Sequence, residues 1–314
     1  MNKTTSIKDT QSVPALHDTS PFFIVGVQRS GTTMLRLMLN QHPHLAIPFE
    51  SGFIAEFYRK IDRYGDLHDT GNRNRLLSDI AGDDWVVRGK LIDDVTTIAK
   101  YPASDYAEIV AAIFQDYARR KGKPRWGDKT PGYVDEIDTL WKVFPGCKFI
   151  HLVRDGRDVA LSLRRIAWGT SSIPRMAHEW RWKTLLAHKM GNLLGDHFLE
   201  VRYEDLVLDT EATLRTICAF LGESYDARML DYHVKGVKAD ELPSDSIRWH
   251  RMSVRAPDPK KVFEWKTAMS EADQIIFEEI AGDALSAFGY ECRGRTPTLK
   301  SRLRKLHYML IRRW

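Results

Sequence analysis

Two mostly apolar segments, each followed by a glycine-containing turn and then by a helical pattern, most constrain the fold of this chain. Pro21-Phe-Phe-Ile-Val25 precedes Gly26-Val-Gln-Arg-Ser-Gly31, and Cys147-Lys-Phe-Ile-His-Leu-Val153 precedes Arg154-Asp-Gly-Arg-Asp158. Short β-rich runs of this kind are typical of strands that are buried on both faces of a parallel sheet. We therefore predict an α/β fold in which a parallel sheet is flanked by helices.

Other segments support the same fold class. Helical spacing predicts helices over residues 32–40, 105–121, 134–144 and 159–165, with another helix after the Asp209 cap and one from the Ser270 capping box to Phe288. Residues 198–203 form a further predicted strand. Strands that alternate with helices indicate a parallel sheet.

The 314 residues suffice for one large core with insertions. We expect a flexible N-terminal segment over residues 1–20, one domain over residues 21–292 and a separate tail over residues 293–314. The only cysteines, Cys147, Cys218 and Cys292, form no metal or disulfide pattern. The sequence shows no secretory signal and no run of about 20 apolar residues. Together with the cysteine pattern, this leads us to expect a cytoplasmic protein.

The positive charge is concentrated in the tail. The formal net charge of the chain is +5, and residues 293–314 contain eight Lys or Arg and no acid. The remaining chain is slightly acidic, so we expect no nucleic-acid partner. The tail leucines recur at helical spacing, at positions Leu299, Leu303, Leu306 and Leu310. This basic amphipathic helix could lie on an anionic membrane, pack on the protein itself or bind a partner subunit.

The first glycine-containing turn has the features of an anion site. Backbone N–H groups between Gly26 and Gly31 would lie at a helix N-terminus, where the helix dipole favours negative charge. Thr32 occupies the position of the lysine in a Walker loop, while Arg29 supplies a cation inside the turn. A tight turn with a surface arginine is the alternative, but the neighbouring hydroxyls of Ser30 and Thr33 favour the anion site.

The second turn is another possible anion site. Arg154 follows the predicted strand directly, and Ser162 lies eight residues later on the following helix. Ligands of open parallel sheets bind beyond the carboxyl ends of the strands, so both turns can face one crevice. Local pairing of Asp155 and Asp158 with the neighbouring arginines is an equally good interpretation of this segment alone.

The two segments together resemble a known family. Phe23-Ile-Val-Gly-Val-Gln-Arg-Ser-Gly-Thr-Thr33 is similar to the 5′-phosphosulfate motif of sulfotransferases, and Phe149-Ile-His-Leu-Val-Arg-Asp-Gly-Arg-Asp-Val-Ala-Leu-Ser162 is similar to their 3′-phosphate motif. The resemblance covers roughly residues 21–290 and is strongest to the bacterial, protein-tyrosine and carbohydrate branch, which uses a glutamate base. Gln28 departs from the family pattern, in which proline or glycine is commoner.

The resemblance implies a P-loop-like sulfotransferase fold and a 3′-phosphoadenosine 5′-phosphosulfate (PAPS) donor. Residues implied to bind the 5′-phosphosulfate are Arg29, Ser30, Gly31, Thr32 and Thr33. Those implied for the rest of the donor are Arg154 and Ser162 at the 3′-phosphate, Tyr203 near the adenine, and Ser253, Lys260 and Lys261 in a clamp.

The same resemblance implies two catalytic residues. Glu50, 21 residues after Arg29, matches the family's general base, and Lys129 matches the lysine that approaches the transferring group. We expect Asp128 to orient Lys129, and no metal to take part. A cation placed where negative charge develops stabilises the transition state.

The acceptor is less constrained. Residues 225–265 read as a long functional loop, and tryptophans 168, 180 and 182 could stack on an acceptor or pack in the core. We prefer a hydroxyl of a carbohydrate or glycolipid. A P-loop nucleotide kinase and a non-catalytic nucleotide-binding scaffold are the alternatives to a sulfotransferase.

Overall fold

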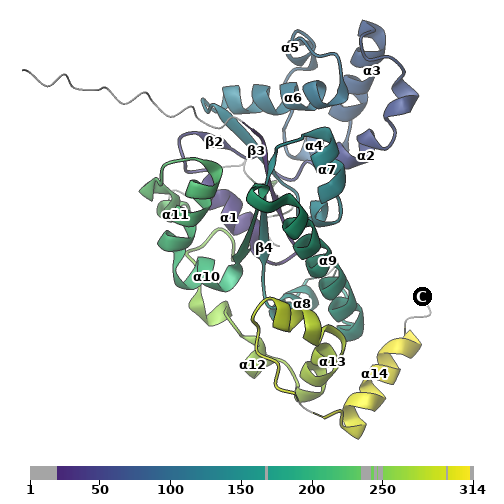
Figure 1. The fold of residues 1–314 in the computed structure, drawn as a ribbon, viewed down its shortest axis with the longest axis vertical. Coiled ribbons are helices and arrows are strands. Elements are labelled where there is room, and N and C mark those ends of the chain that lie inside the picture. The colour runs from purple at the N-terminus through teal and green to yellow at the C-terminus, as the bar shows by residue number, and fades with distance from the viewer. Residues whose placement is uncertain are drawn as a thin grey trace, which may run out of the picture.

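The computed structural model describes residues 20–166, 169–234, 242, 243, 246, 250–294 and 296–311. A five-stranded sheet with strand order β2-β3-β1-β4-β5 lies at the centre, and the neighbouring strands of the described residues are parallel (Figure 1). The strands are β1 (Phe22–Val25), β2 (Leu45–Ala46), β3 (Arg125–Lys129), β4 (Lys148–Val153) and β5 (Phe198–Arg202). The predicted parallel α/β fold is confirmed. The expected flexible segment over residues 1–20 lies outside the described residues except for Ser20.

The central strand β1 brings the chemistry-bearing segments together. Ile24 is in register with Lys129 of β3 on one side and with Ile150 of β4 on the other. Because all three strands run in the same direction, the turns that follow them open at the same edge of the sheet. The two glycine-containing turns and Lys129 therefore meet at this edge.

Alternate residues of β1 pack into different cores. Phe22 and Ile24 contact α1 (Thr32–Leu39), α10 (Tyr203–Leu208) and α11 (Thr210–Leu221) on one face of the sheet. Phe23 and Val25 belong to the core on the other face. The helices of that second core are α2 (Phe53–Tyr58), α3 (Thr70–Ala81), α4 (Asp84–Arg88), α5 (Val95–Ile98), α6 (Tyr106–Arg120) and α7 (Ile137–Val143).

A third core lies beyond β4 and is made by helices from the second half of the chain. These are α8 (Gly156–Arg164), α9 (Ile173–Leu194), α12 (Trp265–Ala268) and α13 (Glu271–Ala287). The last described helix, α14 (Leu299–Ile311), lies beside α13 and α9 at the lower end of the molecule (Figure 1). No described helix is long and apolar enough to cross a membrane.

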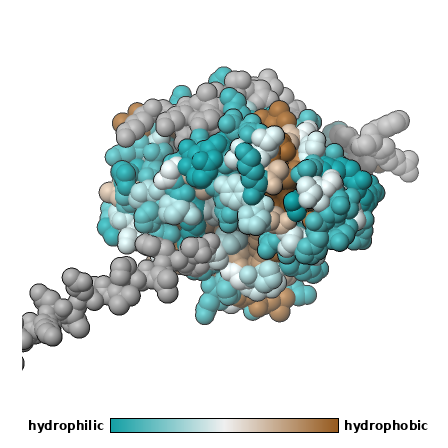
Figure 2. All heavy atoms as spheres, turned by 90° about the horizontal axis from the view of Figure 1, so that it is seen from above, coloured by the Kyte–Doolittle hydropathy of each residue, from teal (hydrophilic) through white to brown (hydrophobic). Residues whose placement is uncertain are grey.

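The face drawn in Figure 2 is mainly hydrophilic and is interrupted by a narrow hydrophobic band.

Most predicted elements are confirmed, with shifted ends. Asp105, Asp209 and Ser270 cap α6, α11 and α13 with their side chains, as their residue types predict. Helix α8 begins at Gly156, earlier than predicted, because Asp155 accepts a hydrogen bond from the Arg157 amide as its cap. Helix α7 begins later than predicted because residues Pro131–Asp135 form a 3-10 turn. Strand β3, helices α2 to α5 and the 22-residue α9 were not predicted.

Candidate functional site

A cavity of about 780 Å³ opens at the carboxyl edge of the sheet. Both glycine-containing turns and the segment around His250 contribute to its wall. The sequence-predicted residues that line it are Arg29, Gly31, Thr32, Thr33, Glu50, Arg154, Ser162, Tyr203, Ser253 and Lys261. The structure thus brings together residues that are more than 200 positions apart in the chain.

The first turn has a strained backbone. Arg29 adopts a left-handed conformation with φ 74°, which is uncommon for a residue with a side chain. Gly31 has φ 97°, and a Cβ atom there would lie 2.5 Å from Cδ2 of Tyr203. Only glycine fits this position without displacement of the tyrosine ring. The turn then leads directly into α1, whose first residues are Thr32 and Thr33.

The two turns are joined by their arginines. Arg29 Nε donates a hydrogen bond to Ser162 Oγ at 3.1 Å, and Arg154 Nη1 donates to the backbone oxygen of Arg29 at 3.3 Å. Arg29 and Arg154 therefore face one cavity, as the sequence predicts, rather than opposite sides of the molecule. The local pairing considered for the second turn also occurs, since Arg157 is buried against Asp155 and Glu278.

Arg154 is positioned by three elements. Its guanidinium lies over the Tyr203 ring at 4.3 Å from the centroid, a cation–π contact. Its Nη2 donates to the backbone oxygen of Lys261 at 2.8 Å. The carbonyl of Arg154 itself accepts a hydrogen bond from the Trp180 indole, so a core residue of α9 fixes the end of β4. These contacts hold the guanidinium at the cavity wall.

The polar groups of this wall are suited to an anionic ligand. Burial and the neighbouring Arg154 charge lower the pKa of Arg29, as expected of two cations held close together. Arg154 Nε is buried and has no hydrogen-bond partner among the described residues. The same holds for Ser30 Oγ, but Ser30, unlike the other predicted residues of the first turn, does not line the cavity. A buried donor without a partner is costly, and a bound phosphate or sulfate group at the wall would satisfy Arg154 Nε.

A carboxylate and a lysine meet at another part of the wall. Lys129 Nζ donates to Glu50 Oε1 at 2.6 Å and to Thr33 Oγ1 at 3.4 Å. Lys129 is the last residue of β3 and is fully buried, whereas the Glu50 side chain is 19% exposed and lines the cavity. Burial lowers the pKa of Lys129, which Glu50 opposes. The glutamate is thus open to a ligand while the lysine is held behind it.

Asp128 does not hydrogen-bond to Lys129, which corrects the expectation that it orients the lysine. Its carboxylate accepts hydrogen bonds from Ser51 Oγ at 2.8 Å and from Thr130 Oγ1 at 3.1 Å. The reason is the strand geometry, because successive side chains of β3 point to opposite faces of the sheet. Burial raises the pKa of Asp128 to about 7. Asp128 thus anchors the segment next to Glu50 rather than the lysine.

The late clamp residues are placed differently from one another. Ser253 and Lys261 line the cavity, but Lys260 is exposed and is not among the lining residues, so the two lysines are not equivalent. Lys261 Nζ is paired with Glu264, which also accepts two hydrogen bonds from Arg165 of the loop after α8. These pairs lower the pKa of Glu264 to about 2. The clamp segment is therefore tied to the end of α8.

Sequence reasoning missed three residues of the wall. His250 lies near Phe49 with ring centroids 6.5 Å apart, and burial with the nearby cations lowers its pKa to about 3. Trp85 extends the aromatic surface from Phe49, and Asp158 Oδ2 is buried without a hydrogen-bond partner among the described residues. No motif marks His250 or Trp85, whereas Asp158 lies in the second turn, where the sequence suggested only pairing with the neighbouring arginines. Two of the tryptophans proposed for the acceptor do not line this cavity, since Trp180 is in the core and Trp182 is exposed on α9. The third, Trp168, is outside the described residues.

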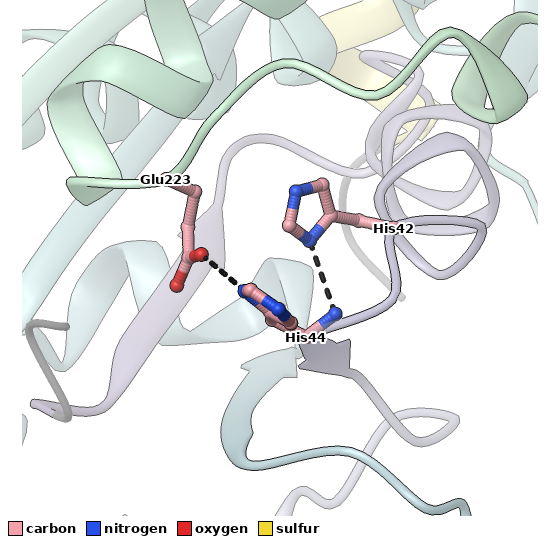
Figure 3. Close-up of side chains that lie close together, drawn as sticks. All are labelled: His42, His44 and Glu223. Atoms are coloured by element: carbon pink, nitrogen blue, oxygen red, sulfur yellow. Dashed lines mark hydrogen bonds and ion pairs between the residues drawn. The ribbon is translucent and has the colours of Figure 1, made fainter. Parts of the chain in front are cut away.

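A separate cluster, His42, His44 and Glu223, offers three side chains of metal-ligating types, within 4.8 Å of one another (Figure 3). His42 accepts a hydrogen bond from the His44 amide at Nδ1, and its Nε2 bonds the Ser224 carbonyl. His44 Nδ1 lies 2.9 Å from Glu223, which also pairs with Arg125. None of the three lines the cavity. These hydrogen bonds and ion pairs give the cluster a structural role, because they connect the start of β2 to the end of α11.

Comparisons with known proteins identify the class of the chain. The sulfotransferase family model matches residues 21–227. The sulfotransferase domain of the Synechococcus PCC 7002 olefin synthase is 27% identical and has a TM-score of 0.60, with coverage of 87% of this chain and 97% of that domain. The protein belongs to the sulfotransferase family.

Two curated relatives are similar over most of the chain. Protein-tyrosine sulfotransferase A of Caenorhabditis elegans is 25% identical, covering 89% of this chain and 70% of the relative. The nodulation protein NoeE of Sinorhizobium fredii is 26% identical, covering 87% and 68% respectively. The chain is a PAPS-dependent sulfotransferase with the fold of that family. The paired arginines and the buried Arg154 Nε without a partner fit an anionic ligand.

Proposed function

We propose that this enzyme transfers the sulfuryl group of PAPS to a hydroxyl of a carbohydrate or glycolipid, with Glu50 as the general base. The observation that carries the proposal is the Lys129–Glu50 contact of 2.6 Å at the wall that also holds Arg29 and Arg154. A general base must reach the acceptor proton, and in this pair it is the Glu50 carboxylate, not Lys129, that faces the cavity.

The donor site is proposed residue by residue. The first turn, with Arg29 to Thr33, would bind the 5′-phosphosulfate, and Arg154 with Ser162 would bind the 3′-phosphate. The 3.1 Å contact between Arg29 Nε and Ser162 Oγ supports a single nucleotide site, because it joins the two halves. Tyr203, Ser253 and Lys261 would enclose the remainder, whereas the exposed Lys260 would act at most from the rim.

The chain's own residues would act on a proton and on charge. Glu50 would accept the proton of the acceptor hydroxyl, and loss of this proton would make the hydroxyl oxygen more nucleophilic. PAPS supplies an electrophilic sulfur and a phosphate leaving group. Lys129 and the N-terminus of α1 would stabilise the negative charge that develops on the leaving oxygen, and this stabilisation is larger in the transition state than in the ground state. No residue of this site is assigned to a metal.

The acceptor class is supported by the wall next to Glu50. Phe49 and Trp85 have ring centroids 6.3 Å apart, and Trp85 is 39% exposed. Such rings can stack on the apolar face of a sugar. The tyrosine of a polypeptide is the second acceptor class, favoured by the relatives that are named protein-tyrosine sulfotransferases.

Offering radiolabelled PAPS with two acceptor panels tests the proposal. One panel contains glycans and glycolipids, and the other contains tyrosine peptides with and without acidic flanking residues. We expect label on the sugar hydroxyls and a loss of that activity in Trp85→Ala with donor affinity unchanged. Label confined to tyrosine would replace the proposed acceptor by the second class.

Two other functions are separated by simpler measurements. A P-loop kinase would bind ATP with magnesium more tightly than 3′,5′-phosphoadenosine (PAP), the desulfated donor, and we expect the reverse. A non-catalytic scaffold would bind PAP but transfer no label to any acceptor in either panel.

A further inference from the structure

Helix α14 is docked on the protein by its polar side. Ser301, Arg304, Lys305 and Tyr308 recur at i, i+3, i+4 and i+7, so they share one face of the helix. Arg304 Nε lies 2.8 Å from the fully buried Asp273 of α13, and Lys305 Nζ lies 2.6 Å from Glu279. Two of the tail's cations are thus paired with acidic residues of α13.

The apolar side of the same helix points away from the protein. Leu299, Leu303, Leu306 and Leu310 recur at i, i+4, i+7 and i+11 and therefore share the opposite face. Their exposed fractions are 74%, 59%, 48% and 66%. An ordinary surface helix buries its apolar face and exposes its polar face, so this arrangement is inverted. A contiguous exposed apolar ridge marks an interaction surface.

The charges beside this leucine ridge select its partner. Lys300 lies on one flank and Arg302 on the other, and both are exposed. The sequence from residue 293 to residue 314 contains no acid. A second copy of α14 would bring like charges together along the ridge, which opposes self-pairing. A surface with an apolar interior and negatively charged outer groups complements both the leucines and the cations that flank them.

We propose that α14 lies on an anionic lipid bilayer, with its leucine ridge in the acyl boundary and its flanking cations at the headgroups. The polar contacts with Asp273 and Glu279 hold the helix against the protein while the ridge is inserted. The helix is 13 residues long, so it would rest in the interface and not span the bilayer.

Co-sedimentation of the whole chain with vesicles tests this proposal. We expect binding to phosphatidylcholine vesicles that contain phosphatidylglycerol, weaker binding to phosphatidylcholine alone, and a decrease with added salt. The double variant Leu303→Gln, Leu306→Gln should bind at least about tenfold more weakly, because each leucine loses its apolar burial. Arg302→Gln should weaken binding about fivefold.

The matched control is Leu208→Gln on α10, because Leu208 is also exposed, at 60%, but lies far along the chain from α14. This variant should bind vesicles as the unmodified chain does. Equal vesicle binding by the ridge variant and the control would overturn the proposal. So would a dimer in analytical ultracentrifugation that the ridge variant dissociates, since the ridge would then belong to a second copy. Both variants keep the docking face, and circular dichroism checks that they fold.

Discussion

Arg154 donates a hydrogen bond from Nη1 to the backbone oxygen of Arg29 at 3.3 Å, so the turns after β1 and β4 form one structural unit. The turns are 125 residues apart in the chain and come from neighbouring strands. This contact joins the Arg154 guanidinium to the backbone of the first turn. A ligand that bridges the arginines therefore meets a preorganised pair of charges.

We expect Arg154→Ala to remove recognition of one phosphate selectively. Hydrogen bonds to charged groups contribute about 1.5–3 kcal/mol, so PAP affinity should fall at least about tenfold. The affinity for adenosine 5′-phosphate should change by less than about threefold. Isothermal titration with both nucleotides measures the two effects. The control is Arg228→Ala, an exposed arginine paired with Asp226. An equal loss for both nucleotides would mean that Arg154 only supports the fold.

Gly31→Ala should destabilise the first turn. The new methyl group would lie 2.5 Å from Tyr203, and φ 97° is unfavourable for alanine. We expect the free energy of unfolding to fall by about 2 kcal/mol and PAP binding to weaken. Urea unfolding provides the measurement. Gly132→Ala is the control because nothing lies within 4 Å of its added Cβ. Comparable stability of the two variants would show that the turn tolerates a side chain.

Asp158 should make stability fall as pH rises. Burial raises its pKa to about 7, whereas an unfolded aspartate titrates near pH 4. Between these values the unfolded chain has released the proton that the folded chain still holds, so the free energy of unfolding decreases with increasing pH. From about pH 5 to pH 8 this contribution is about 2.5 kcal/mol, and Asp158→Asn should abolish it.

Urea unfolding at both pH values checks this dependence. The asparagine can still accept the hydrogen bond from the Trp265 amide, which Asp158 accepts at 2.8 Å, so the core contact is preserved. The exposed Asp138→Asn is the control. If the Asp158 variant kept the full pH dependence, other groups would have to account for it.

Lys129→Met should slow turnover and leave donor binding nearly intact. Methionine fills the volume of the buried side chain but lacks the charge that contacts Glu50 and Thr33. A loss of about a hundredfold in kcat is the scale for removal of one stabilising charge or donor. PAP affinity should change by less than about threefold, which titration measures together with thermal unfolding. A loss of PAP binding equal to the loss in kcat would place the lysine in ground-state binding.

The sequence predicted the parts of the fold that are signalled locally. Strands β1 and β4, their turns and helix α6 have apolar runs, glycines and caps that specify structure within about twenty residues. It did not predict β3, because Arg125-Trp-Gly-Asp-Lys129 is largely polar and becomes a buried strand only through pairing with β1 and β2. Tertiary context overrides intrinsic propensity in such segments.

The placement of the two arginines at one cavity was predictable for a similar reason. Arg29 and Arg154 lie within recognisable motifs, and both face the cavity as expected. His250 and Trp85 could not be found in this way, since each reaches the wall from a segment without a motif. Asp158 lies within the second motif, but the sequence suggested only pairing with the neighbouring arginines for it. The placement of Asp128 depended on the alternation of side chains along β3, which could not be assigned before that strand was known.

The most direct test of the proposed chemistry compares Glu50→Gln with Glu56→Gln in single-turnover transfer from radiolabelled PAPS. Glutamine keeps the size of Glu50 and can still accept a hydrogen bond from Lys129, but it cannot take up the acceptor proton. Glu56 is an exposed glutamate on α2 that pairs with Lys60. We predict a loss of at least about a hundredfold for Glu50→Gln, with PAP affinity unchanged and Glu56→Gln fully active. Equal transfer rates for the two variants would contradict the assignment of Glu50 as the base.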